Sequence, residues 1–292
     1  MKLEVPKGKY VLAVSGGVDS VALLDMLAKK SGIELIVAHF NHGIRSDSDK
    51  DEKLVVKAAE GLGLKWAVGY GNLGETASEE AARDARYAFL KQVQADYGAK
   101  AIITAHHQDD LIETALTNVI RGTGRLGLSA ITANKAVLRP LLNTPKASLV
   151  SYAHRHKLKW REDSTNSNTD YQRNYLRLKV LPKLTAGQRQ QIVNDVDKVA
   201  KINSKLNKEI ATLSQSLGNE KLNREKFTEL SANIGNELVA HILRQAEVAD
   251  FDSKTVNRLS MAIKTSRPNS IHHVKKKSSL KVGVKTASLI TP

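Results

Sequence analysis

The stretch YVLAVSGGVDSVALLDMLAKK, residues 10–30, joins an apolar run to an amphipathic segment through two adjacent glycines. The run predicts a buried strand, and the segment from residue 18 predicts a helix. Glycine lets the backbone approach an anion closely, and the first turn of a helix offers unpaired amide groups and the positive end of its dipole. The connecting loop therefore predicts a phosphate-binding site formed by Ser15, Gly16, Gly17, Val18, Asp19 and Ser20.

This loop differs from the ATPase loop that ends in Gly-Lys-Ser/Thr, because it contains no lysine. The hydroxyl groups of Ser15 and Ser20 and the carboxylate of Asp19 occupy the loop instead. A carboxylate beside phosphates indicates a bridging Mg²⁺, since this ion takes few protein ligands and keeps several waters. We therefore predict Asp19 as a Mg²⁺ ligand. The alternative is an ordinary glycine turn before a helix capped by Asp and Ser.

The first half of the chain alternates short β-branched runs with longer amphipathic segments. The runs lie at 10–14, 33–40, 65–68 and 101–105, and the segments at 18–30, 47–62, 76–97 and 107–121. This alternation predicts an α/β fold in which a parallel sheet carries helices on both faces. Ligands of such sheets bind at the carboxyl ends of the strands. A run at 137–142 closes the region, and helical patterns follow near 145–157 and 170–183.

The stretch LTAGQ, residues 184–188, predicts a boundary between a first domain at 1–185 and a smaller second domain at 186–292. We predict a mainly helical second domain, with helical patterns near 223–247 and 253–264. Short strands are expected at the end of the chain. Before these helical patterns, apolar residues recur at spacings of three and four or their sums, which predicts one long amphipathic helix. They are Ile192, Val196, Val199, Leu206, Ile210, Leu213 and Leu217.

The formal net charge of +15 belongs almost entirely to the second half of the chain. Residues 1–150 carry 19 lysines and arginines against 17 acidic residues, whereas residues 151–292 carry 26 against 13. No acidic residue follows Asp252. Such asymmetry predicts a near-neutral domain and a second domain that binds a polyanion such as nucleic acid. A solvated, structureless tail is the alternative for the basic run that includes Lys275, Lys276 and Lys277.

The composition excludes several classes of protein. There is no cysteine, which rules out disulfides, Cys-ligated zinc, iron–sulfur clusters and a thiolate nucleophile. No apolar run approaches the roughly 18–20 residues of a membrane span, and the apolar stretch near the N-terminus is too short for a signal peptide. We therefore expect a cytoplasmic protein without a membrane partner.

A second polar cluster follows the fourth predicted strand. His106, Asp110 and Glu113 are spaced i, i+4 and i+7, which places them on one face at the start of a helix. The adjacent histidines His106 and His107 lack the HExxH spacing of catalytic zinc sites. A solvated helix N-terminus, in which the dipole favours acidic residues, is the other alternative.

These residues resemble known families. The sequence SGGVDS is similar to the SGGxDS signature of the N-type ATP pyrophosphatases, whose fold is adenine nucleotide α-hydrolase-like and whose members cleave ATP between the α- and β-phosphates to adenylate a substrate. Within that group the chain resembles the tRNA(Ile)-lysidine synthase family. The resemblance is dense over residues 10–185 and rests on HFNHGIR at 39–45, RDARY at 83–87, AHHQDDLIET at 105–114, RGTG at 121–124 and RNYLR at 173–177.

The resemblance implies a set of residue roles. Asp110 and Glu113 match the acidic pair that receives the amine of free lysine. Arg86, Arg173 and Arg177 are candidates for stabilising a pentavalent α-phosphate, because guanidinium stays charged and can bind phosphate oxygens bidentately. The alternative is that each is a surface arginine. His39 and His106 are assigned to ATP. The expected substrate contacts are Asn41, His42, Arg45, His107 and Arg121, with loop capping as the alternative for those that follow the second strand.

Residues 122–127 match GxGxxG, yet they follow a predicted helix rather than a strand. A dinucleotide-binding turn needs the strand, so we reject that interpretation. In the family this segment belongs to the rim that faces tRNA.

The activity implied by the resemblance is ATP-dependent ligation of lysine to C2 of the wobble cytidine in an isoleucine tRNA with a CAU anticodon. ATP with Mg²⁺, free L-lysine and that tRNA are the expected ligands. A tRNA 2-thiolase of the same group would need cysteines to carry sulfur, and a non-catalytic tRNA-binding protein is the alternative from another class. The oligomeric state stays open, with a homodimer as one alternative.

Overall fold

The computed structural model describes residues 3–43, 48–71, 78–133, 136–161, 172–219, 221–248, 251–275 and 278–290. The chain divides into two compact units, residues 1–200 and 201–292. A search of the described helices finds none with the length and apolarity that a bilayer crossing needs.

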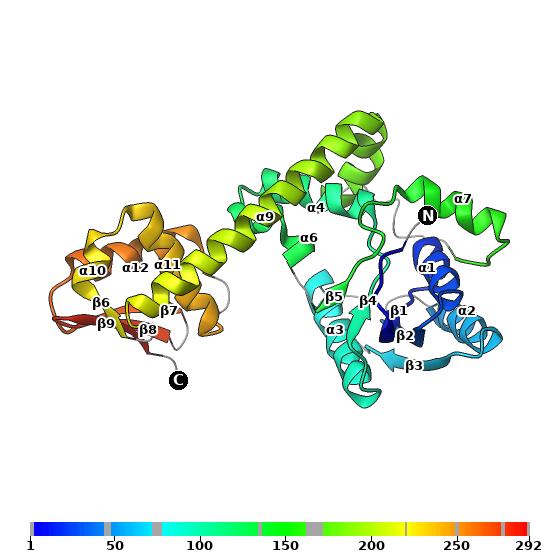
Figure 1. Cartoon of the computed structure of the whole chain (residues 1–292), viewed down its shortest axis with the longest axis horizontal. Coiled ribbons are helices and arrows are strands. Elements are labelled where there is room, and N and C mark those ends of the chain that lie inside the picture. The colour runs from blue at the N-terminus through cyan, green and yellow to red at the C-terminus, as the bar shows by residue number, and fades with distance from the viewer. Residues whose placement is uncertain are drawn as a thin grey trace. The chain divides into compact units, whose positions relative to one another are not determined.

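The first unit is built on a five-stranded sheet in the order β3-β2-β1-β4-β5 (Figure 1). All four pairings are parallel. The strands are β1 (Gly8–Ala13), β2 (Ile33–Asn41), β3 (Lys65–Tyr70), β4 (Ala101–Ile103) and β5 (Val137–Leu138). The predicted α/β class with a parallel sheet is confirmed.

Successive residues of the central strands point to opposite faces of the sheet, and each face has its own core. Leu12 of β1 packs with Leu23, Leu24 and Leu27 of α1 (Val18–Ala28). Its neighbour Val11 belongs to the core on the other face, beneath α3 (Glu79–Asp96). The helices α2 (Ser48–Gly61) and α7 (Lys146–Arg155) lie on the α1 side, since Val55 and Leu149 join that core. Helices therefore cover both faces, as the continuous apolar runs predict.

The chain order reverses direction across β1, which has β2 on one side and β4 on the other. At such a point the loops leaving the two strands diverge and open a crevice at their carboxyl ends. The loop after β1 is the phosphate-binding loop, and the loop after β4 leads into α4 (Gln108–Ile120). The topology thus brings the two sequence clusters to the same edge of the sheet.

Short elements complete the first unit. Helices α5 (Arg125–Leu128) and α6 (Ala130–Ala133) follow α4, so the GxGxxG match does follow a helix. Helix α8 (Gln172–Tyr175) continues into a π-helical turn, Leu176–Val180, and a 3₁₀ turn, Leu181–Lys183. Leu176 and Leu181 pack against Leu111 and Ile112 of α4, which fixes this segment beside the helix.

Helix α9 (Ala186–Ser216) contributes to both cores: Val193 and Val196 pack in the first unit, and Ile210 and Leu217 pack in the second. The second unit also contains α10 (Arg224–Glu229), α11 (Ala232–Gln245) and α12 (Ser253–Thr265). The predicted helix at 223–247 is therefore two helices, because the Ser231 side chain caps a new start.

The chain ends in an antiparallel sheet of order β6-β9-β8-β7, comprising β6 (Lys221–Asn223), β7 (Ser270–Lys275), β8 (Ser278–Val282) and β9 (Thr286–Ile290). Leu280 and Val282 of β8 are buried, as their alternation with polar residues predicts. The structureless alternative is thus wrong for residues 270–275 and 278–290, whereas Lys276 and Lys277 lie outside the described residues.

Candidate active site

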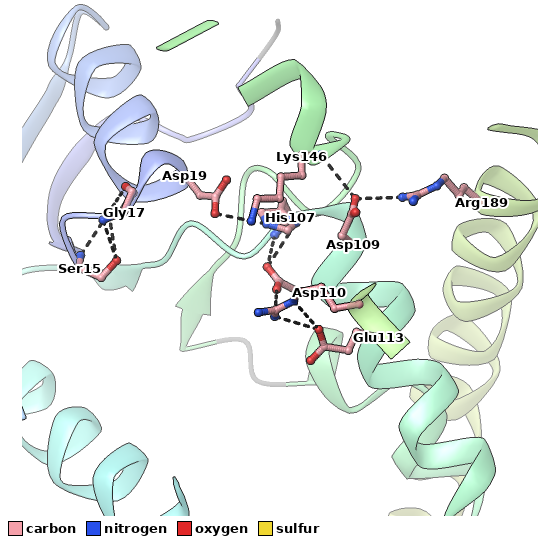
Figure 2. Close-up of polar contacts among 11 residues, drawn as sticks. Ser15, Gly17, Asp19, His107, Asp109, Asp110, Glu113, Lys146 and Arg189 are labelled. Carbon is pink, nitrogen blue, oxygen red and sulfur yellow. Dashed lines mark hydrogen bonds and ion pairs between the residues drawn. The ribbon is translucent and has the colours of Figure 1, made fainter. Parts of the chain in front are cut away.

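The loop between β1 and α1 holds its shape through its own hydroxyl groups (Figure 2). The backbone amide of Ser15 donates to Ser20 Oγ at 3.2 Å, and Ser20 Oγ donates to the Gly17 carbonyl at 2.9 Å. Gly16 has φ +91°, and a Cβ there would lie 3.4 Å from Cβ of Asp51. Only glycine combines this backbone conformation with so close a neighbour at little cost. The two serines therefore shape the loop, which leaves amide groups at the start of α1 for an anion.

Asp19 lies in the first turn of α1, and its two carboxylate oxygens have different surroundings. Its Oδ2 lies 3.4 Å from Nε2 of His107, whereas Oδ1 is buried and has no hydrogen-bond partner among the described residues. A buried carboxylate oxygen left without a partner is costly unless a ligand completes it. Mg²⁺ accepts one or two carboxylates together with phosphates and water, so this oxygen fits the ion. Among the described residues there is no group of three His, Asp or Glu side chains that could hold a metal without further ligands.

A cleft of about 790 Å³ lies at the carboxyl edge of the sheet in the first unit. It is large enough for a nucleotide together with a second reactant. The sequence-predicted residues that line it are Ser15, Gly17, Val18, Asp19, His39, Asn41, His42, Arg86, His107, Asp110 and Arg177.

His107 connects the two sequence clusters. Its Nε2 lies 3.4 Å from Asp19, and its Nδ1 lies 3.4 Å from Oδ2 of Asp110. Burial by itself would lower the pKa of His107, but the hydrogen bond with Asp19 and the charges of Asp19 and Asp110 outweigh it, so the pKa is raised. The phosphate-loop carboxylate and the α4 carboxylate therefore share one imidazole (Figure 2).

Arg177 meets both carboxylates that were predicted to bind an amine. Its Nε donates to Glu113 Oε2 at 3.1 Å, its NH2 group lies 2.8 Å from the same oxygen, and it lies 3.7 Å from Asp110 Oδ1. Glu113 is buried, with 7% of its side chain exposed. Two carboxylates facing one guanidinium leave one formal negative charge, which matches one further cation.

The carboxyl end of β2 and the residue that follows it also line the cleft. Nδ1 of the buried His39 donates to the Val14 carbonyl at 2.8 Å, which leaves Nε2 as the acceptor of the neutral ring. Asn41 donates to Asp49 and Glu52 and accepts from the Gly43 amide, so its side chain is occupied in shaping this loop. Burial lowers the pKa of His42, and Arg86 adds to the effect.

The other sequence-predicted residues fall in different places. Arg121 is exposed at the carboxyl end of α4, away from the α4 start that forms the cleft. Arg173 belongs to α8, and Arg45 lies outside the described residues. Arg86 lies in the cleft wall, 5.5 Å from the Tyr87 ring centre.

His106 corrects one prediction. Helix α4 begins at Gln108, with His107 as its N-cap and the Asp110 carboxylate accepting from the His107 amide at 2.9 Å. His106 therefore precedes the helix, and its placement on one helical face with Asp110 and Glu113 is wrong. Its Nδ1 instead pairs with Thr104 Oγ1 at 2.7 Å. Burial lowers the pKa of His106 to about 4; Asp110 opposes this shift, and Arg139, Arg86 and Arg83 add to it.

This shift predicts a pH dependence of stability. The folded-state pKa of about 4 lies below the ordinary value of 6.5, so the stabilisation is present above pH 6.5 and is lost as the pH falls toward 4. We expect His106→Gln to remove a slope of at most about 1.4 kcal/mol per pH unit from the free energy of unfolding across that window. Denaturant titrations of both proteins, with exposed His273→Gln as the control, measure it. Parallel curves for wild type and His106→Gln would contradict it.

The structure adds residues to the cleft that sequence reasoning missed. Lys146, His154, Trp160 and Arg161 line it, and Arg161 Nε lies 2.7 Å from the buried Asp51. For Lys146 the sequence carried one signal, because the helix dipole disfavours a lysine directly after Pro145 at the start of a helix. For the other three residues no sequence motif marks a place in the cleft.

Comparison with known proteins defines the family of this protein. A model of the ATP-binding PP-loop domain matches residues 2–184, more than half of the chain, so the protein belongs to the PP-loop domain family. Its sequence is 41% identical over 186 residues to tRNA(Ile)-lysidine synthase of Thermus thermophilus, covering 61% of this chain and 36% of that protein. It is 36% identical over 193 residues to tRNA(Ile)-lysidine synthase of Exiguobacterium sibiricum, covering 63% of this chain and 45% of that protein. The chain thus matches less than half the length of these two relatives.

Among solved structures, the U34-tRNA thiolase NcsA of Methanococcus maripaludis, determined with its [4Fe-4S] cluster, has the same fold. The TM-score is 0.57 at 19% sequence identity, and the match covers 68% of this chain and 74% of the thiolase. At this identity the likeness extends to the fold alone.

Proposed function

We propose that this protein ligates lysine to C2 of the wobble cytidine of an isoleucine tRNA with a CAU anticodon, at the expense of ATP. The observation that carries the proposal is the contact of His107 with both Asp19 and Asp110. It joins a phosphate loop to an acidic pair within one cleft, as a reaction needs when it activates one substrate with ATP and transfers it to an amine. The names of the curated relatives support the choice of substrates.

The first step would form an adenylated base. The O2 atom of cytidine attacks the α-phosphorus of ATP, a new P–O bond forms, and the bond to the β-phosphate breaks to release pyrophosphate. The Ser15–Ser20 loop binds the phosphates, Asp19 holds Mg²⁺, and Arg86 and Arg173 are the proposed partners of the charged α-phosphate. His39, whose Nδ1 donates to the Val14 carbonyl, is the proposed acceptor, through Nε2, of a hydrogen bond from an amino group of the nucleotide.

The second step would transfer the base to lysine. The ammonium group of lysine gives one proton to water, the resulting amine attacks C2 of the cytidine, and the bond from C2 to the adenylate oxygen breaks to release AMP. Asp110 and Glu113 would hold the incoming ammonium, and with Arg177 their two negative charges are then balanced by two positive ones. Most of the catalysis in this scheme is positioning and charge balance.

RNA of this kind is read as unpaired bases splayed out of a loop. The basic half of the chain, in which 26 lysines and arginines stand against 13 acidic residues, is the proposed grip on the tRNA backbone. A cytoplasmic location is part of the proposal, and a tRNA substrate supports it. The thiolase alternative is weakened because an iron–sulfur cluster needs thiolate ligands, and this sequence has no cysteine.

The proposal is tested by incubating the protein with ATP, Mg²⁺, radiolabelled lysine and an unmodified isoleucine tRNA that carries the CAU anticodon. We expect lysine to enter acid-insoluble RNA only with ATP, and not to enter the same tRNA with a uridine in place of the wobble cytidine. Pyrophosphate release without lysine incorporation would point to a different amine or to thiolation. Retention of tRNA with neither activity would favour a non-catalytic binding protein.

A further inference from the structure

The phosphate loop is held from outside by two segments that are distant from it in the sequence. The carbonyl of Gly16 accepts a hydrogen bond from the Arg161 amide at 3.0 Å. Asp51 of α2 packs against the same glycine, since its Cβ lies 3.4 Å from the position that a Cβ of Gly16 would take. Arg161 and Asp51 also form an ion pair, in which Arg161 Nε lies 2.7 Å from Asp51 Oδ1. The three residues therefore contact one another in pairs.

The contact of Gly16 with Arg161 decides which way the next amide points. The peptide between Gly16 and Gly17 is trans and planar, so its carbonyl and its N–H group point in opposite directions. Because the carbonyl is directed at Arg161, the Gly17 N–H group is directed into the loop, where Ser15 Oγ lies 3.4 Å from its nitrogen. Gly17 also lines the cleft. The Arg161 amide thus orients a donor from which a phosphate oxygen in the loop can accept.

Arg161 belongs to neither a helix nor a strand, so its place depends on its contacts. It lies in the irregular segment that follows the end of α7 at Arg155. The preceding Trp160 makes an edge contact with His154 of α7, at 5.0 Å between the ring centres. The ion pair with Asp51 adds a charged anchor that is shielded from water, since only 7% of the Asp51 side chain is exposed. A shielded pair holds its geometry more firmly than a surface pair does.

The ion pair also allows a carboxylate to lie beside an anion-binding loop. A buried Asp51 without a counter-ion would be costly and would repel a phosphate, and Arg161 compensates its charge. Two roles of the pair predict opposite results. If it acted through charge alone, neutralising Asp51 would make the loop more positive and would strengthen phosphate binding. If it acts by orienting the loop, the same change weakens phosphate binding.

We propose that Asp51 and Arg161 are positioning residues for the phosphate loop. Their ion pair fixes the Arg161 amide on the Gly16 carbonyl and so aims the Gly17 amide at the phosphates of ATP. The inference deepens the proposed function and rests on it in taking ATP as the ligand of the loop. Removing either charged side chain therefore weakens phosphate binding, although the two changes in charge are opposite in sign.

Equilibrium dialysis of the full chain with radiolabelled ATP and with radiolabelled inorganic pyrophosphate, each with Mg²⁺, tests the proposal. We expect Asp51→Asn and Arg161→Gln each to raise both Kd values by about 10- to 100-fold, the range for one lost hydrogen bond to a charged group. The double variant should lose no more than either single variant, because both changes remove the same contact. Adenosine, measured as a competitor of ATP, should keep its Kd within about twofold, because it has no phosphate.

The matched controls are Asp195→Asn and Lys198→Gln, which break an exposed ion pair of α9 and should leave every Kd unchanged. The same titrations give the number of binding sites per chain. A pair that served only for folding would lower this number and leave the Kd of the remaining sites unchanged, and that result would overturn the proposal. Tighter ATP binding by Asp51→Asn, or an equal loss of affinity for adenosine, would also overturn it.

Conservative variants cover the case in which Asp51→Asn or Arg161→Gln does not fold. Arg161→Lys and Asp51→Glu keep the charges and alter the geometry, so each should give a smaller rise in the Kd for ATP, and an unchanged Kd would contradict the proposal. Because binding is measured without tRNA and lysine, the outcome is separate from the fate of the proposed function. Failure of lysine incorporation by the wild type, together with the expected Kd changes, would reject the ligase and keep the positioning role.

Discussion

Replacing Asp19 by alanine is expected to lower the rate of pyrophosphate release from ATP by about 10²- to 10³-fold, while tRNA retention changes by less than about twofold. The physical reason is the buried Oδ1, which has no partner among the described residues and is the proposed Mg²⁺ ligand. Without that ligand the ion and the phosphates lose their fixed relation to the start of α1. Pyrophosphate release and filter binding of tRNA, measured on the same preparation, provide the two numbers.

Two variants control this experiment. Asp19→Asn keeps the size of the side chain and removes its charge, so it should resemble the alanine variant if the carboxylate holds a cation. Asp84→Ala changes an exposed carboxylate of α3 and should behave as wild type. Equal loss of tRNA retention in Asp19→Ala would contradict the separation between an ATP site in the first unit and an RNA grip in the basic half.

Replacing Glu113 by glutamine is expected to raise the KM for lysine by at least about 30-fold. Glu113 is buried and binds Arg177 through two short contacts, so the neutral amide leaves the guanidinium poorly compensated and removes the charge proposed to attract the amine. Transfer of adenylate to tRNA in the absence of lysine should continue at a rate within a few-fold of wild type.

The rate of lysine incorporation into tRNA at increasing lysine concentration gives the KM. The rate of tRNA adenylation without lysine is measured separately. Glu209→Gln on the exposed side of α9 is the control for a change of one charge. A fall in adenylation as large as the fall in lysine transfer would show that Glu113 supports the whole cleft rather than the amine.

The sequence predicts the framework well because its signals are local. The apolar run at 10–14, the two glycines and the helix from residue 18 occur in the structure as β1, the loop and α1. Short continuous apolar runs favour strands buried on both faces, and their alternation with helical segments favours a parallel sheet. The carboxyl-edge rule then brings the loops after β1 and β4 together without further information.

The parts that sequence reasoning missed depend on contacts between distant segments. The Asp110 carboxylate accepts from the His107 amide and so sets the start of α4, which spacing alone does not reveal; this is why His106 was wrongly placed on the helix. Lys146 lines the cleft because Leu149 packs α7 onto α1, and Trp160, which follows that helix in the chain, lines it as well. The contact of Arg177 with Glu113, 64 residues away in sequence, was not predicted, and the role of Arg177 at the α-phosphate stays a prediction.

The central claim is that one cleft adenylates the RNA first and passes it to lysine second. Its most direct test uses ATP labelled on the α-phosphate, with the CAU isoleucine tRNA and no lysine. We predict that label becomes acid-insoluble with the tRNA and is released as AMP when unlabelled lysine is added. Label that never joins the RNA, or that joins lysine in the absence of tRNA, would contradict the account.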